Sequence, residues 1–229
     1  MSETRTKISD TAEQIVRSRT CGCKDLYVAQ VLKNTATQYV TGTPRKMSRM
    51  IKAKIDEKWT SDKIYSDDEP EEVIGAYEGT DVELEVNALA PQDRAFLFGQ
   101  RYENGYLVKT SDDVAPEVAI GWRERKLNGK YEFKWLYVGK FAEGISDEAN
   151  TKEGKLSPTT KSIKGSFYER SIDGKYEISV DESNLVNEDT DAKTALENWF
   201  SAVQEYTDSA ENAEAEDSTE DTETNADTE

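Results

Sequence analysis

Residues Glu78 to Gly144 read EGTDVELEVNALAPQDRAFLFGQRYENGYLVKTSDDVAPEVAIGWRERKLNGKYEFKWLYVGKFAEG. An alternating segment comes first, a short helix candidate follows, and a further strand leads into a strong hairpin candidate. This order of elements predicts a mainly β domain. The stretch has no combination of residues typical of a catalytic site, so it indicates a building block rather than an enzyme.

The alternating segment belongs to a long strand, or a bent pair of strands, expected from Glu72 to Ala88. Successive side chains of a strand point to opposite faces of its sheet. One face would therefore be apolar, and the other would carry carboxylates. The apolar members are Val82, Leu84 and Val86, and the acidic members are Asp81, Glu83 and Glu85. Such an acidic face is most often only a hydrated surface.

Pro91 and Gly99 mark the two ends of the helix candidate. Proline suits the first helical turn, where its missing N–H costs nothing, and glycine suits the left-handed position after the last turn. We therefore expect a helix over Gln92–Phe98. Asn104-Gly105 then turns the chain into the strand candidate that begins at Tyr106.

Asn128-Gly129 is the strongest local turn signal, because a two-residue type I′ hairpin turn prefers this pair. The expected register follows from that turn. It places Arg125 opposite Glu132, Trp122 opposite Trp135 and Ile120 opposite Tyr137. Asp173-Gly174 predicts a second turn of the same type, with Arg170 opposite Glu177.

The N-terminal part predicts an arm, a strand and a charged segment. Residues 1–23 are polar and are expected to form a mobile arm, and Asp25–Leu32 is a strand candidate. Arg45–Asp68 alternates with period two and is rich in charge. Its basic residues are Arg45, Lys46, Arg49, Lys52 and Lys54. Two interpretations stay open: a solvated hairpin arm, or an arm that contacts an acidic surface of a neighbour.

The C-terminal part predicts a helix and a tail. Asp191–Val203 should form a helix whose apolar face docks on the core. The residues of that face are Leu196, Trp199, Phe200 and Val203. Residues Thr207–Glu229 have ten acidic residues, no basic residue and no apolar residue larger than alanine. This composition is typical of a disordered segment.

Together these elements predict a β-sandwich or partly closed barrel with one flanking helix, a C-terminal helix and a long extended loop. The expected organisation is a mobile arm over residues 1–23, a β domain over 24–206 and a disordered acidic tail over 207–229. Within the β domain, residues 45–70 would form the extended arm.

The composition excludes much common enzyme chemistry. The chain has no histidine, which removes Ser-His-Asp triads, Cys-His pairs and HExxH zinc sites. Its two cysteines, Cys21 and Cys23, are too few for a thiolate zinc site and too close for an unstrained disulfide, so we interpret them as reduced. The sequence shows no apolar window for a membrane helix and no secretory signal, so synthesis in the cytoplasm is the default.

The net charge is −18, and the last 23 residues hold ten of those negative charges, which leaves −8 for residues 1–206. A body of this charge shows no general preference for nucleic acid, which is held by Lys and Arg against phosphate.

Several segments resemble the major tail proteins of long-tailed phages that infect Gram-positive bacteria (the phi13-type family). The segments are DLYVAQV, VELEVNAL, PQDRAFLFG, ENWF and the block YENGYLVKTSDDVAPEVAIGWRERKLNGKYEFKWLYVGKFAEG. The resemblance runs from about Lys24 to Phe200 and is most specific from Leu107 to Gly144. The acidic tail after Tyr206 lies outside the pattern.

The resemblance implies a structural virion protein without a catalytic site or cofactor. Its partner would be itself, in rings, expected to be hexameric, that stack into a tail tube through which double-stranded DNA passes without specific binding. Other partners would be the tape measure, tail terminator and distal tail proteins, with no membrane. The charged segment would be the arm that reaches the next ring. Asp81, Glu83 and Glu85 would line the lumen, because a DNA conduit gains from repelling phosphate.

Three other functions are compatible with the residues. A β-sandwich module that binds another protein would use an exposed loop or edge and stay small in solution. An acidic DNA mimic would rely on the tail Thr207–Glu229, which lacks regular charge spacing. A carboxylate enzyme could place a metal at Asp67-Asp68-Glu69, although such a sequence is usually only a turn.

Overall fold

The computed structural model describes residues 15–66, 69–146, 160–186 and 189–206. The described elements are β1 (Thr20–Thr35), β2 (Gln38–Thr41), β3 (Arg45–Lys46), β4 (Met50–Ser66), β5 (Glu69–Val86), α1 (Pro91–Phe98), β6 (Arg101–Glu103), β7 (Tyr106–Val108), β8 (Val118–Lys126), β9 (Tyr131–Lys140), β10 (Ile145–Ser146), β11 (Lys161–Tyr168), β12 (Glu177–Asp181) and α2 (Thr190–Glu197). Neither helix in this part of the chain is long and apolar enough to cross a membrane.

One antiparallel sheet of ten strands organises the body. Its main path runs β2-β1-β8-β9-β11-β5-β4, while β3 pairs with β1, β10 with β11 and β12 with β9. The sheet folds over on itself, so that apolar residues of β1 and β8 pack against those of β5 and β11. The fold is therefore mainly β and sandwich-like, as the sequence predicts, and it does not close into a barrel.

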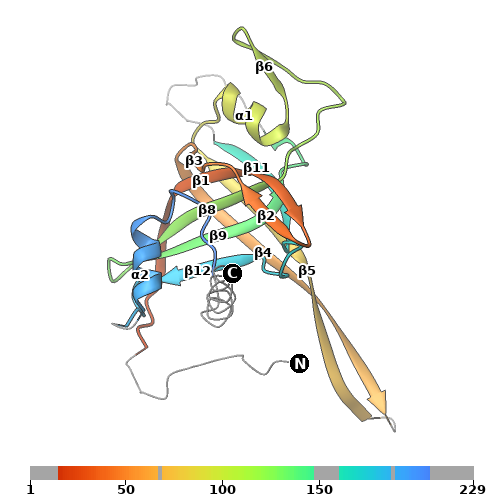
Figure 1. Cartoon of the computed structure of the whole chain (residues 1–229), viewed down its shortest axis with the longest axis vertical. Helices are drawn as coiled ribbons and strands as arrows, with labels where there is room; N and C mark the ends of the chain where they lie inside the picture. The colour runs from red at the N-terminus through yellow and green to blue at the C-terminus, as the bar shows by residue number, and fades with distance from the viewer. Residues whose placement is uncertain (1–14, 67–68, 147–159, 187–188, 207–229) are drawn as a thin grey trace, which may run out of the picture.

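The molecule is elongated, with a different projection at each end. Figure 1 shows α1 and the small β6–β7 hairpin at one end and the far part of the β4–β5 hairpin at the other. Helix α1 begins at Pro91 and ends at Gly99, which has a left-handed φ of 67°. The turn between β6 and β7 has positive φ at Asn104 and Gly105. Both predictions are confirmed.

Two apolar clusters lie on opposite sides of β8 and β9. The first fills the inside of the folded sheet and includes Trp122 and Val82. The second covers the other side and is closed by α2 and the residues after it, with Trp199 only 1% exposed. The predicted docking of the Leu196, Trp199, Phe200 and Val203 face is confirmed, because all four belong to this second cluster.

Helix α2 is shorter than predicted, since it ends at Glu197 rather than Val203. The backbone carbonyl of Asn198 accepts a hydrogen bond from the N–H of Ser201, only three residues later, at 2.9 Å. The carbonyl of Trp199 accepts the indole N–H of Trp135 at 3.0 Å. The residues after Glu197 dock on the sheet and therefore form turns instead of continuing the helix.

The predicted register of the β8–β9 hairpin is wrong by one residue. Gly129 has a φ of 84°, but Asn128 does not have a positive φ, and Lys126 pairs with Lys130 around a three-residue loop. The observed partners are Trp122 with Lys134 and Gly121 with Trp135. A type I turn followed by one left-handed glycine is a common three-residue hairpin.

This shift changes the faces of the two tryptophans. A one-residue change of register moves a side chain to the other side of the sheet. Trp122 therefore lies in the first cluster and Trp135 in the second. The ring of Trp135 lies over Gly121, where a Cβ atom would come within 2.5 Å of it.

The second predicted hairpin does not form, and the chain turns through the four residues 171–174 rather than through the predicted two-residue type I′ turn. Gly174 has a φ of 69° and the N–H of Arg170 bonds the carbonyl of Lys175 at 2.9 Å. Beyond this turn the flanking strands β11 and β12 do not pair with each other, because both pair with the same edge of β9. Arg170 consequently contacts Asp173 and Glu205 instead of Glu177.

The N-terminal boundary of the body also moves. Strand β1 begins at Thr20, so Cys21 and Cys23 lie within it, and both are free. The predicted arm is therefore wrong for residues 20–23, which pair with β8. Residues 1–14 and the predicted tail 207–229 lie outside the described residues.

Candidate inter-subunit surface

The β4–β5 hairpin is partly sheet and partly projection. Strand β11 pairs with β5 from Val86 back to Thr80, and Thr80 pairs with Glu57 of β4. Beyond Glu57 and Thr80, the described residues of the hairpin pair only with each other. The projecting part, here called the arm, comprises residues 58–66 and 69–79 and points away from the body (Figure 1).

A bulge marks the point where the arm leaves the body. Lys58 pairs with Gly79 and Trp59 with Tyr77, so Glu78 is an extra residue in β5. Gly79 has a φ of 143°, and a Cβ there would lie 3.0 Å from the backbone oxygen of Phe167. Bulges bend a strand pair and raise its twist. The bend at Gly79 therefore sets the direction of the arm.

An aromatic cluster supports the root of the arm. The ring of Tyr77 stacks on that of Tyr176, with centroids 4.1 Å apart, and Trp59 meets Tyr77 edge-on at 5.4 Å. The Tyr77 hydroxyl also bonds the buried Thr80 side chain at 2.7 Å. Stacked aromatic pairs add stability beyond their area. The root is therefore held by the loop that precedes β12.

At its root and beyond, the arm exposes apolar surface. Trp59 remains 55% exposed and Ile74 48% exposed, although both lie on a two-stranded segment. A two-stranded ribbon is only marginally stable alone in water. Each of its strands leaves the backbone N–H and C=O groups of its outer edge unpaired. The arm is thus a surface suited to contact another molecule.

The five basic residues predicted for the arm lie on the body instead, which corrects their assignment. Arg45 and Lys46 form β3, where they pair with Asp93 of α1 and Asp25 of β1. Arg49 precedes β4, and its carbonyl accepts the N–H of Asn87 at 3.0 Å. Lys52 and Lys54 lie in the part of β4 that pairs with β5 over the body. Period-two alternation alone could not show where the neighbouring strand β11 ends.

The acidic strand face is where the sequence predicts it. Val82, Leu84 and Val86 are buried, and Asp81, Glu83 and Glu85 lie on the opposite, partly exposed side of β5. The face is not an uninterrupted negative band, however. Lysines of the adjacent strands share it, because directly paired residues point to the same side. They are Lys52, Lys54 and Lys58 of β4 and Lys164 of β11.

These lysines are partly paired with the carboxylates. Lys58 forms an ion pair with Asp81, and Lys52 reaches Glu85 at 3.5 Å. The hydrogen bond from Lys58 lowers the pKa of Asp81 below its ordinary value. The hydroxyl of Ser162 donates to Glu83 at 3.1 Å. The face is therefore close to charge balance.

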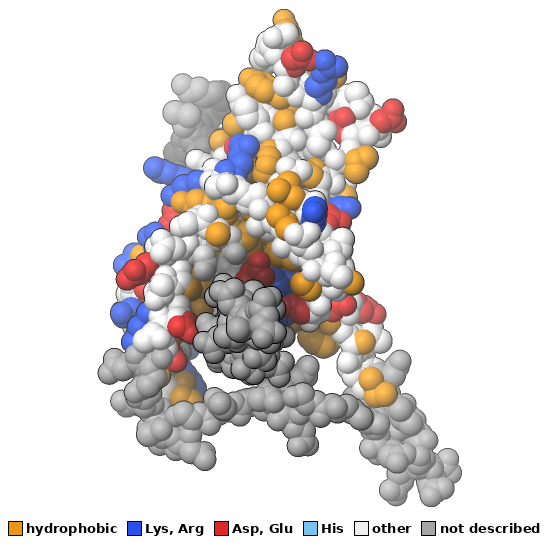
Figure 2. Space-filling view, viewed as in Figure 1, with side chains coloured by type: hydrophobic (Ala, Val, Ile, Leu, Met, Phe, Trp, Pro, Cys, Tyr) orange, Lys and Arg blue, Asp and Glu red, His pale blue; other side chains and the backbone are white. Residues whose placement is uncertain are grey.

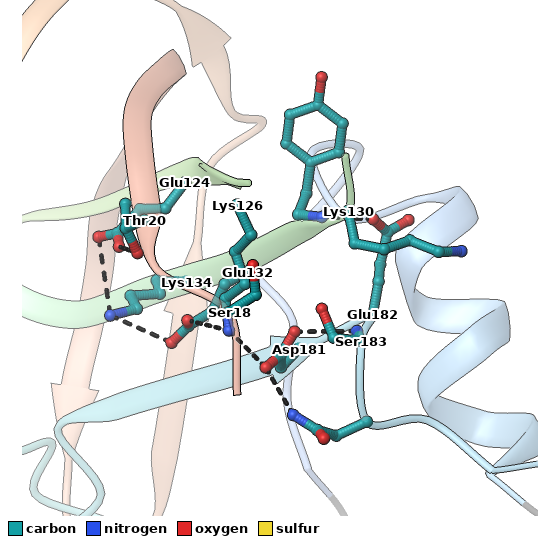
Figure 3. A network of polar contacts seen from close by, with 12 residues as sticks. Ser18, Thr20, Glu124, Lys126, Lys130, Glu132, Lys134, Asp181, Glu182 and Ser183 are labelled. Atoms are coloured by element: carbon teal, nitrogen blue, oxygen red, sulfur yellow. Dashed lines mark hydrogen bonds and ion pairs between the residues drawn. The ribbon is translucent and has the colours of Figure 1, made fainter. Parts of the chain in front are cut away.

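A second cluster of charges ties β8, β9 and β12 together (Figure 3). Lys126 is only 7% exposed and contacts Glu132 at 3.0 Å and also Asp181. Burial alone would lower the pKa of Lys126, but its bonds to Asp181 and Glu132 raise it above the ordinary value. A lysine kept protonated in this way cannot act as a base or nucleophile. This network therefore serves structure.

The described part of the chain contains no group of three or more Cys, Asp or Glu side chains that could hold a metal ion. The metal candidate Asp67-Asp68-Glu69 involves Asp67 and Asp68, which lie outside the described residues. No family model matches the chain, and no curated protein sequence matches it either.

Proposed function

We propose that this chain is a structural virion protein, the major subunit of a phage tail tube, which polymerises as stacked rings and lets DNA pass. The observation that carries the proposal is the arm, a bent and braced hairpin that leaves the body and exposes Trp59 and Ile74. An isolated ribbon of this kind gains stability when a neighbour covers it.

The two ends of the molecule support head-to-tail assembly. The arm lies at one end, and the β6–β7 hairpin, with Tyr106 74% exposed, lies at the other (Figure 1). A contact between different surfaces of identical chains builds rings when the rotation closes and filaments when it does not. Stacked rings, hexameric in the resemblance, are one such assembly.

The proposed passage of DNA is compatible with the charges of the body. Residues 1–206 carry −8, and the face of Asp81, Glu83 and Glu85 is nearly balanced by lysines. Passage without binding requires that few cations contact phosphate, because each contact releases counterions and adds affinity. Lysines already paired to carboxylates meet that requirement.

The test is to shorten the arm without cutting the body. Thr60 and Ala76 are directly paired, so an Asn-Gly turn can join them in place of residues 61–75. We expect this variant to keep the unfolding midpoint of the body and to lose tubes in negative-stain electron microscopy. Tubes of normal length from the shortened chain would contradict the role of the arm.

A protein-binding module without enzymatic activity is the second candidate. The apolar exposure around the β6–β7 hairpin favours it, since Tyr106 and Val114 are 74% and 76% exposed. Such a module would stay a monomer or small oligomer. Light scattering across a concentration series separates the two functions, because only the tube subunit grows into long polymers.

A further inference from the structure

A basic patch stands out on an otherwise acidic protein. Lys24 and Arg123 are directly paired across β1 and β8, and Arg125 pairs with Gly22 two positions along. Lys46 of β3 joins them through Asp25, which also accepts a hydrogen bond from Arg123 at 2.7 Å. Figure 2 shows Lys and Arg side chains gathered along the left edge of the view. We call Lys24, Lys46, Arg123 and Arg125 the basic patch.

The patch surrounds an aromatic ring. The ammonium of Lys24 lies 4.5 Å from the ring centre of Tyr131, and the guanidinium of Arg123 lies 4.8 Å from it. The hydrogen bond from Lys24 lowers the pKa of the Tyr131 hydroxyl, and the charges of Arg125 and Arg123 lower it further. The local potential is therefore positive.

Part of this positive charge has no carboxylate partner. Among the described residues, neither Lys24 nor Arg125 forms an ion pair. The carboxylates that border the patch are Asp25, between Lys46 and Arg123, Glu182, which accepts the backbone N–H of Tyr131, and Glu197, which lines a shallow pocket with Lys46 and Arg123. Two exposed cations thus remain available to an anion.

The chain itself contains an acidic segment that is long enough to reach the basic patch. Residues 207–229 have ten acidic residues and no basic one. Phe200 stacks on Tyr27, beside Lys46, with ring centres 4.4 Å apart. Tyr206 is six residues later in the sequence, a path of at most about 20 Å. A segment of 23 residues spans at most about 75 Å, so its length allows it to reach the patch from Tyr206.

We infer that the acidic tail, residues 207–229, docks on the basic patch of its own chain. Tethering gives the tail an effective concentration in the millimolar range, so several weak contacts are enough to hold it there. The rest of the body is acidic and repels the tail, which makes the patch its preferred location. The docking is electrostatic, so it needs no folded tail. It is independent of the proposed tube function.

The test uses the full chain in its unassembled form. Backbone amide signals of residues 207–229 are recorded by NMR at about 20 mM and about 500 mM salt, where screening differs strongly. We expect the tail signals and the amides of Lys24, Arg125 and Tyr131 to shift together as salt is added. The double variant Lys24→Gln/Arg125→Gln should show the high-salt tail signals already at low salt.

A matched double variant separates the effect of the patch residues from the effect of a change in net charge. Lys33 and Lys109 are exposed lysines outside the patch, so Lys33→Gln/Lys109→Gln removes the same two charges. This control should keep the salt-dependent shifts. Equal behaviour of the two double variants, or tail signals that do not change with salt, would overturn the inference.

Two further measurements exclude other occupants. Tenfold dilution should leave the shifts unchanged, and a loss on dilution would mean that the tail docks on a second copy instead. A single-stranded oligonucleotide of ten phosphates should compete weakly, because it must displace a tethered segment. Complete displacement at equimolar oligonucleotide would show that the patch prefers nucleic acid and would refute the docking.

Discussion

The two long hairpins of this protein differ in what covers them. The β8–β9 hairpin has apolar residues buried on both sides, with Trp122 in one cluster and Trp135 in the other. The arm of the β4–β5 hairpin leaves Trp59 more than half exposed. Both are antiparallel pairs joined by a short connection. The first therefore holds the fold together, and the second is free to make contacts beyond it.

Trp199 gives the largest expected effect, because it closes the second cluster over β9. Replacing it with alanine, Trp199→Ala, should lower the free energy of unfolding by about 3–5 kcal/mol, the usual cost of removing a buried aromatic side chain. Urea unfolding followed by circular dichroism measures the change.

Trp59→Ala removes the same type of side chain from the arm and serves as the comparison. Its effect on unfolding should stay below about 1 kcal/mol, because the ring is largely exposed. Tube formation should suffer instead. Similar losses of stability for the two variants would mean that the arm belongs to the cooperative core.

Gly79→Ala tests the bend at the root. The substitution forces an alanine into a φ of 143° and places its Cβ 3.0 Å from the oxygen of Phe167. We expect a loss of about 1–3 kcal/mol in the free energy of unfolding, the range for strained backbone positions. Gly75→Ala is the control, since a Cβ there meets nothing within 4 Å. A larger loss from Gly75→Ala would argue against the bend as the strained position.

Asp173 tests the loop between β11 and β12, which braces both regions. Burial alone would raise its pKa, but hydrogen bonds from Arg170 and Lys175 lower it to about 2. Its folded pKa lies below the unfolded value of about 3.9, so the carboxylate stabilises the fold above pH 4 and the contribution disappears as the pH falls toward 2.

Asp173→Asn should therefore cost about 1–2 kcal/mol at pH 7 and progressively less between pH 4 and pH 2. Urea unfolding at several pH values measures this convergence. If the free energies of unfolding of the wild-type protein and Asp173→Asn differ by the same amount from pH 4 to pH 2, the Asp173 carboxylate is not the source of this stability.

The smallest expected effect is at the Lys58–Asp81 pair, because both side chains are about half exposed. Exposed ion pairs contribute little and are screened by salt. Lys58→Ala should raise the pKa of Asp81 toward its ordinary value, as NMR titration can show, while the unfolding midpoint stays the same. An unchanged pKa of Asp81 would show that the pair does not form in solution.

Sequence signals predicted well those elements of the fold that depend only on neighbouring residues in the chain. Pro91 and Gly99 bound α1, and the alternation from Asp81 to Val86 predicts which side chains are buried. Asn104-Gly105 turns as expected. Each of these depends on backbone preferences or periodicity within a few residues, so no distant contact is needed to decide it.

The candidate site was only partly predictable. The sequence predicts a projecting hairpin and an acidic face on β5. It also predicts the five basic residues on the arm, whereas they lie on the body of the fold. Their position depends on where β11 stops pairing with β5, at Phe167 and Thr80. The lysines that balance the acidic face come from β4 and β11, and no local pattern indicates which strands become neighbours.

The sequence by itself determined a mainly β protein with a C-terminal apolar face and an acidic tail, because composition and periodicity decide which residues can be buried. Only the tertiary structure decided the register of β8–β9, the pairing of β12 with β9 and the end of α2. Those features depend on packing across the sheet: Trp135 fits over Gly121, and its indole bonds the carbonyl of Trp199. Contacts between residues far apart in sequence override a local turn preference when they bury more apolar surface.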